Sequence, residues 1–185
     1  MIKCSTNVQQ DIENLYVYDK KGNLTQTIRP NDTKTITEYN KLNQVSKLTN
    51  YEKWGRVISC FQYEYDSLGN ITKEEIEQDY TKVVNEYGYN GRGELEIVKE
   101  TQKGTTKYVK YAYDACGNRI QMDESINNNK YTTKYNYDEA DRLKTIDSAG
   151  RFNQAYTYDV NGNLVKVDTN GTKVVEYNYT IENRL

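Results

Sequence analysis

The sequence predicts an all-β protein, built as an antiparallel array of about eight β-hairpins. Three observations predict it. A tyrosine-rich phrase recurs eight times, turn-forming residues follow each copy at a fixed spacing, and the tyrosines alternate with other residues as in an extended strand. The phrase is clearest at Tyr111–Asn118. Counted at its aspartate position, the copies lie at residues 19, 40, 66, 90, 114, 138, 159 and 180, a spacing of 21 to 26 residues.

Each copy is expected to open with a β-strand. Two tyrosines separated by one residue lie on the same face of an extended chain, and tyrosine is a favoured strand residue. In Tyr111–Asn118 a third residue, Val109, continues the alternation toward the N-terminus. The other copies begin at Tyr16, Thr37, Tyr63, Tyr87, Tyr135, Tyr156 and Tyr177.

Each strand is expected to run into a type I turn followed by a left-handed residue. The first turn position holds a side chain that can accept a hydrogen bond from backbone amides two residues on. Three positions later comes a residue type that tolerates positive φ. The pairs are Asp19 with Gly22, Asn40 with Asn43, Asp66 with Gly69, Asn90 with Gly93, Asp114 with Gly117, Asp138 with Asp141, Asp159 with Gly162, and Thr180 with Asn183.

An apolar residue usually opens the return strand, as at Leu24 and Leu164, and Arg119 is the exception. The connection back to the next copy is less regular in sequence. Turn signals there are Pro30–Asp32, Asn127–Asn129, Ala149–Gly150 and Asn170–Gly171, the last of which predicts a type I′ hairpin turn. The whole chain, residues 1–185, is therefore expected to be a single domain that runs as a meander of hairpins.

Composition limits the possible partners. The net charge is −2, basic and acidic residues are interspersed, and no basic block or transmembrane run occurs, so neither nucleic-acid binding nor membrane insertion is expected. The 19 tyrosines supply buried area that the aliphatic residues lack, which argues against disorder. The N-terminus lacks the apolar core of a signal peptide.

The phrase resembles the YD repeat of the Rhs family, which is also found in toxin-complex proteins, wall-associated bacterial proteins and teneurins. Tyr16–Leu24 and Tyr156–Leu164 carry it in full, and the resemblance covers residues 16–185. It implies a long sheet that is curved or wound into a spiral, and that in full-length relatives closes into a hollow shell. In bacterial relatives the shell typically holds a C-terminal toxin, so the resemblance also implies a secreted or cell-surface location within a larger bacterial protein.

The chain departs from the complete family form. Relatives that release a toxin seal the shell with a proline-rich, self-cleaving region, whereas Pro30 is the only proline here. The resemblance therefore implies the architecture but neither autoproteolysis nor toxin activity. We expect a fragment or open segment of a larger shell, or a small protein that pairs its sheet edges with another chain. The expected partners are further YD-repeat segments or an enclosed toxin polypeptide.

The residues for chemistry are sparse. The sequence contains no histidine, and Cys4, Cys60 and Cys116 are unclustered, so no catalytic, metal-binding or cofactor-binding residues are assigned. One acidic cluster spans residues 74–79, in which Glu75 and Glu77 would share a strand face. This cluster can be interpreted as the carboxylate pair of a glycosidase or as a solvated charged face, and the solvated face is the favoured interpretation.

The tyrosine rows allow two interpretations. They can form the packed interior of a curved sheet, or an exposed platform on which sugar rings stack. Trp54 likewise either packs over a sheet edge or stacks on a ligand. The candidate glycan platform is Tyr63, Tyr65, Tyr87, Tyr89, Tyr111, Tyr113, Tyr135 and Tyr137. The sequence thus favours a non-enzymatic shell segment, with a cell-surface carbohydrate-binding or adhesion module as the alternative.

Overall fold

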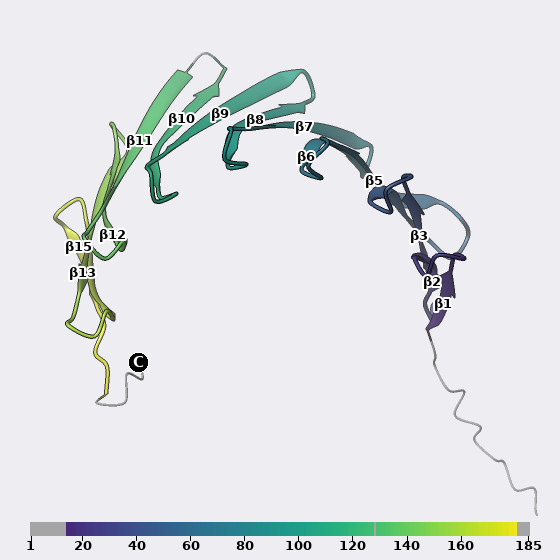
Figure 1. Ribbon diagram of the computed structural model, residues 1–185, viewed down its shortest axis with the longest axis horizontal. Helices are drawn as coiled ribbons and strands as arrows, with labels where there is room; N and C mark the ends of the chain where they lie inside the picture. The colour runs from purple at the N-terminus through teal and green to yellow at the C-terminus, as the bar shows by residue number, and fades with distance from the viewer. Residues whose placement is uncertain (1–13, 128, 181–185) are drawn as a thin grey trace, which may run out of the picture. The chain divides into compact units, whose positions relative to one another are not determined.

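The computed structural model describes residues 14–127 and 129–180, which form strands and turns without a helix (Figure 1). The strands of this part of the chain are β1 (Leu15–Tyr18), β2 (Leu24–Ile28), β3 (Lys34–Tyr39), β4 (Val45–Tyr51), β5 (Val57–Tyr65), β6 (Ile71–Gln78), β7 (Thr81–Tyr89), β8 (Leu95–Gln102), β9 (Thr105–Tyr113), β10 (Arg119–Ile126), β11 (Asn129–Tyr137), β12 (Leu143–Ser148), β13 (Phe152–Tyr158), β14 (Leu164–Thr169) and β15 (Lys173–Glu176). No helix in the described segments has the length and apolar character needed to cross a membrane.

Strand order in the sheet follows chain order from β1 to β15, and each pairing with a determined register is antiparallel. This confirms the predicted array of hairpins. Contacts group the chain into two units, Met1–Val84 and Asn85–Leu185, with β7 crossing the boundary. Whether the chain is a single domain stays a prediction.

One turn joins the two strands of each tyrosine-led hairpin. We call the seven described turns of this kind the repeat turns (residues 19–23, 40–44, 66–70, 90–94, 114–118, 138–142 and 159–163). In each, the fourth residue donates its amide to the carbonyl of the first at 2.9 to 3.3 Å, and its φ is between 56° and 90°. The strand register shifts beside these turns, as between Glu64 and Tyr65. The predicted type I turn with a left-handed fourth residue is therefore confirmed in all seven. Asn183, in the eighth copy, lies outside the described residues.

The connections between hairpins, which we call the return turns, are tighter than the sequence suggested. Asn170 and Gly171 both have positive φ, 57° and 67°, which confirms the predicted type I′ turn. The same conformation occurs at Lys103–Gly104 and at Asp79–Tyr80, where no type I′ turn was expected. Pro30–Asp32 and Ala149–Gly150 are turns as expected, whereas residue 128 of Asn127–Asn129 lies outside the described part.

Trp54 also lies in a tight return turn. The Gly55 amide donates to the Glu52 carbonyl at 2.9 Å, and the Glu52 carboxylate accepts hydrogen bonds from the Arg56 guanidinium. The Trp54 side chain is 85% exposed, and the Lys53 ammonium lies 5.4 Å from its ring centre. The sole tryptophan therefore stands out from the sheet edge, and it does not pack over it.

Tyr80 occupies an unfavourable backbone position. Its φ is 59°, at the second place of a type I′ turn, where Lys103–Gly104 and Asn170–Gly171 have glycine. Left-handed backbone costs a residue with a Cβ about 1–2 kcal/mol, and the fully exposed Tyr80 ring has little packing to offset it. We expect Tyr80→Gly to raise the free energy of unfolding by about 1 kcal/mol in urea titrations. Gly104→Tyr is the reciprocal variant and should lower it, and a destabilising Tyr80→Gly would contradict the explanation.

Strand register places the tyrosine pairs of each unit on one face, which we call the tyrosine face. In the second unit Tyr111 pairs with Met122, Met122 with Thr133, and Tyr135 with Ile146. Directly paired residues of antiparallel strands point to the same side of a sheet. Aliphatic residues share this face, since Leu48 pairs with Phe61 and Val98 with Val109. Among the described apolar side chains only Cys60, Val109 and Tyr135 are buried, so the core is thin.

Candidate functional site

In five repeats, the tyrosine next to the repeat turn ties its hairpin to the preceding one. Its hydroxyl donates to the backbone carbonyl of the residue that opens the preceding return strand, at 2.6 to 3.0 Å. The pairs are Tyr39 with Leu24, Tyr65 with Val45, Tyr113 with Leu95, Tyr137 with Arg119, and Tyr158 with Leu143. That carbonyl lies at the bulge of the repeat turn, so the phenol supplies a donor where the strand ladder is interrupted. Burial raises the pKa of Tyr65, Tyr113 and Tyr137.

The first tyrosines of the pairs pack through their rings. Tyr135 is only 8% exposed, and the Arg119 guanidinium lies 4.4 Å from its ring centre and 5.5 Å from that of Tyr111. Tyr63 and Tyr65 lie in β5 and Tyr87 and Tyr89 in β7, half-buried as well. Within the second unit, Arg119 therefore covers part of the surface that a sugar ring would need. Glycan binding by the eight platform tyrosines stays a prediction.

The first residue of every repeat turn caps its own turn. Its side-chain oxygen accepts hydrogen bonds from the amides of the third and fifth turn residues at 2.8 to 3.1 Å. The amide two residues on is the partner that the sequence predicted. These oxygens act as structural acceptors within the turn, as expected for aspartate and asparagine in such loops.

The fifth residue of each repeat turn is a partner that the sequence analysis missed. Where the first residue is aspartate, the fifth is a donor, as in Asn70 Nδ2 to Asp66 Oδ2 at 3.0 Å and Arg142 Nε to Asp138 Oδ2 at 2.8 Å. Where the first is asparagine, the fifth is an acceptor, as in Asn90 Nδ2 to Glu94 Oε2 at 2.6 Å. The signal in the sequence was the pairing of residue types at the first and fifth turn positions, four residues apart. When the first residue changes from aspartate to asparagine, the fifth changes from a hydrogen-bond donor to an acceptor.

Neighbouring repeat turns of the second unit also contact one another along the edge formed by the strand ends. Arg92 donates to the Asp114 carbonyl at 2.7 Å, and Asn118 Nδ2 donates to Asp141 Oδ1 at 2.8 Å. These contacts link turns that are 22 and 23 residues apart in sequence. The polar groups of this edge are therefore engaged with one another as well as with their own turns.

The turn aspartates predict acid sensitivity. Hydrogen bonds from Asn23, Asn70, Arg142 and Asn163 hold the pKa of Asp19, Asp66, Asp138 and Asp159 below their usual value of 3.8. A carboxyl whose pKa is lower in the folded state stabilises the fold above its unfolded pKa, and loses that contribution as pH falls through its folded pKa. We expect the urea midpoint to be constant from pH 7 to about pH 5 and to fall below about pH 4.

A matched control tests the source of this acid sensitivity. The variant Asp66→Asn with Asp159→Asn removes two of the titrating carboxyls while leaving amide oxygens in place as acceptors. Its urea midpoint should therefore change less with pH below pH 4 than that of the wild type. Equal slopes for the two proteins would show that other carboxyls govern the acid transition.

Two carboxylates of the acidic cluster, Glu75 and Glu77, pair with lysines. Glu75 bonds Lys73 at 2.8 Å and Lys82 at 2.6 Å, and Glu77 contacts Lys82 at 3.6 Å. Hydrogen bonds from Lys73 and Lys82 lower the pKa of Glu75 to about 2. The general acid of a glycosidase needs a raised pKa, so the environment of Glu75 is the opposite of what that role requires. The arrangement matches the favoured interpretation of a solvated charged face.

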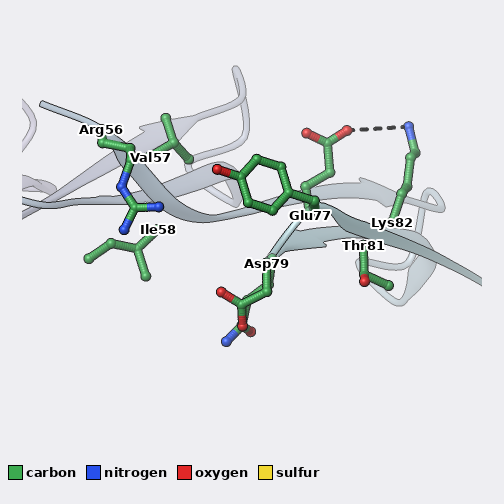
Figure 2. Close-up of a pocket in the computed structure, with 9 residues that line it drawn as sticks. Arg56, Val57, Ile58, Glu77, Asp79, Thr81 and Lys82 are labelled. Carbon is green, nitrogen blue, oxygen red and sulfur yellow. Dashed lines mark ion pairs between the residues drawn. The ribbon is translucent and has the colours of Figure 1, made fainter.

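Figure 2 shows a shallow pocket in the first unit, beside the Asp79–Tyr80 turn. Its volume is about 440 Å³. Val57 and Ile58 from β5 line it together with Arg56, while Glu77 and Lys82 contribute an ion pair from β6 and β7. Glu77 pairs with Lys82 and Arg56 with Glu52, so the pocket presents mixed polar and apolar surface.

The cysteines are separate from each other. Cys60 is buried and Cys116 is exposed in a repeat turn, and both are free thiols, while Cys4 lies outside the described residues. Within residues 14–127 and 129–180, no group of three or more cysteine and carboxylate side chains is placed to hold a metal ion.

Comparison with known proteins places the repeat in a family context. No family model matches the chain. It is 30% identical over 162 residues to the tRNA3(Ser)-specific nuclease WapA of Bacillus spizizenii, and 28% identical over 151 residues to the tRNA nuclease WapA of Bacillus subtilis. These matches cover 85% and 80% of this chain, but the chain spans only 6% of the length of each relative.

Solved structures agree on the fold. A crystal structure of TcdB2-TccC3 has a TM-score of 0.72 at 20% identity, covering 84% of this chain and 9% of that chain. The Photorhabdus luminescens Tc holotoxin pore has a TM-score of 0.57 at 16% identity, covering 82% of this chain and 11% of that chain. The repeat, the hairpin array and these similarities together confirm the resemblance suggested by the tyrosine-led phrase.

Proposed function

From the confirmed resemblance to the Rhs/YD-repeat family, we propose that the chain is a non-enzymatic wall segment of a β-shell. In this role it forms part of a larger, secreted or surface-displayed bacterial protein, and encloses or displays a toxin or another polypeptide. Its similarity in fold to TcdB2-TccC3 supports the proposal.

One observation carries the proposal. The groups that the sequence repeats most regularly are bonded within the sheet: tyrosine hydroxyls to the bulge carbonyls, and turn carboxylates to their own turns. A repeated catalytic or binding group would be expected to present an unsatisfied donor or acceptor to a ligand. Hydrogen bonds of this kind instead join each hairpin to the preceding one, which is what a continuous wall requires.

A face-specific cross-linking experiment tests the wall function. A photo-reactive phenylalanine analogue is placed at Tyr111 on the tyrosine face or at Lys110 on the opposite face, in the protein expressed in its native host. We expect one of the two positions to cross-link a defined polypeptide that mass spectrometry identifies, and the adjacent position to give none. Cross-links to no polypeptide from either face would contradict an enclosing or displaying wall.

The absence of catalysis is tested separately. The two WapA relatives are named as tRNA nucleases, so the purified chain is incubated with total tRNA under conditions in which a nuclease control cleaves it. We expect intact tRNA. Cleavage that tracks with the chain through purification would overturn the non-enzymatic assignment.

A further inference from the structure

Arg119 departs from the repeat at a position where the other repeats have aliphatic residues. Leu24, Val45, Leu95 and Leu143 open the corresponding return strands, and Arg119 opens β10. Its carbonyl performs the usual task, since it accepts the Tyr137 hydroxyl at 3.0 Å. Its side chain differs from those of the other repeats, because its guanidinium lies on the tyrosine face between the rings of Tyr111 and Tyr135. The backbone role therefore does not account for the guanidinium.

Comparison with two other arginines in the same unit shows what Arg119 lacks. Arg142 lies 4.6 Å from the Tyr158 ring centre and bonds Asp138 at 2.7 Å. Arg151 lies 3.7 Å from the Tyr131 ring centre and bonds Glu124 at 3.0 Å. Among the described residues, Arg119 has the ring contacts but neither a carboxylate nor a side-chain hydrogen bond, and its Nε is buried without an acceptor.

Glu124, an acidic residue on the same face as Arg119, already pairs with other basic residues. Glu124 pairs with Val109 in the sheet register, on the same side as the tyrosines. Lys107 at 3.3 Å and Arg151 at 3.0 Å hold its carboxylate, and its side chain is largely buried. The described part of the chain therefore gives Arg119 no carboxylate partner, and its positive charge lies against two aromatic rings.

We propose that Arg119 is a binding site for a carboxylate side chain of an acidic polypeptide segment that lies along the tyrosine face. This rests on the proposed wall function and specifies the chemistry of the polypeptide. A guanidinium presents two parallel N–H groups that match the two oxygens of a carboxylate. The flanking rings of Tyr111 and Tyr135 fix the plane of the fork and exclude water from one side, which strengthens a charged hydrogen bond.

Peptide binding to the intact chain tests the proposal. Two peptides of equal length, one with glutamates and one with lysines spaced by glycine and serine, are titrated while the Arg119 Nε–H signal is followed by NMR. We expect only the acidic peptide to shift that signal, and Arg119→Leu to weaken its binding about tenfold or more. Arg119→Lys, which keeps the charge and loses the fork, should weaken it less.

Two controls separate the site from general effects. Arg119→Leu restores the residue type of the other repeats, so we expect it to fold, with an unchanged circular dichroism spectrum. Arg142→Gln removes an arginine that is already paired and should leave peptide binding at the wild-type level. Equal binding of the acidic and basic peptides, or unchanged binding by Arg119→Leu, would overturn the site.

Polygalacturonate serves as the second acidic probe. Binding of polygalacturonate that depends on Arg119 and exceeds that of the acidic peptide would overturn the assignment to a polypeptide. Failure of the Arg119 site can be distinguished from failure of the wall function. If the acidic peptide does not bind through Arg119 but the tyrosine face still cross-links a polypeptide, only the carboxylate-binding site is refuted. If no cross-links form from either face, the wall function on which the site rests is refuted.

Discussion

Tyr135→Ala is expected to lower the free energy of unfolding by about 3 kcal/mol, the largest effect of any single substitution that we predict. Tyr135 is one of the few buried apolar side chains among the described residues. Removing its ring leaves a cavity beside Met122 and Ile146 and takes away half of the aromatic contact that holds Arg119. Because the core is thin, few neighbouring side chains can move in to refill the space. Urea unfolding followed by tyrosine fluorescence measures the effect.

Phenylalanine variants separate the ring from the hydroxyl. The only partner of the Tyr135 hydroxyl within the described segments is the Met122 sulfur at 4.0 Å, so Tyr135→Phe should change stability by less than about 0.5 kcal/mol. The Tyr137 hydroxyl bonds a bulge carbonyl, so Tyr137→Phe should cost about 1 kcal/mol. Tyr108→Ala, on the opposite face and 39% exposed, is the matched control for ring removal. An equal loss in Tyr108→Ala and Tyr135→Ala would contradict the assignment of the core to the tyrosine face.

This expectation affects how glycan binding is tested. A loss of binding in Tyr135→Ala would be ambiguous, because the same substitution is expected to destabilise the sheet. Tyr111 and Tyr135 also share the Arg119 guanidinium, so either alanine variant would alter a charged neighbour. A glycan array is therefore better probed at Tyr63 of the first unit, which has no cation over its ring among the described contacts.

The parts of the fold that the sequence could predict are those governed by contacts within a few residues. Asp66 and Gly69 show this well, because the acceptor side chain and the left-handed residue of one turn lie three positions apart. The acceptors of the tyrosine hydroxyls could not be predicted. Tyr137 reaches a carbonyl 18 residues away, whose position depends on the pairing of β10 with β11.

Two features of the site illustrate the same limit. Tyr80 has a left-handed backbone although nothing in its residue type favours it, because only two residues lie between the end of β6 and the start of β7. Arg119 was visible in the sequence as an exception. Its missing carboxylate became visible only when the partners of Glu124, Arg142 and Arg151 were known.

Asp66→Ala is expected to cost about 2 kcal/mol, similar to the larger losses seen when a helix N-cap is removed. The Asp66 carboxylate accepts the amides of Leu68 and Asn70 at 2.9 Å and the Asn70 side chain at 3.0 Å. Alanine leaves all three donors without their partner. Urea titration of the variant measures the loss. An effect below about 0.5 kcal/mol would mean that water replaces the carboxylate without penalty.

A rescue experiment isolates the side-chain pair within this turn. Asn70→Glu places two carboxylates together and should cost about 1.5 kcal/mol. Adding Asp66→Asn recreates the arrangement of Asn90 and Glu94, in which the amide donates to the carboxylate at 2.6 Å, and should restore most of the lost stability. Asp66→Asn alone should have little effect, because the Asn70 amide can rotate to present its oxygen. Since the double variant keeps the net charge, recovery would assign the effect to the matched pair, and its absence would show that the exchange of acceptor and donor between repeats is incidental to stability.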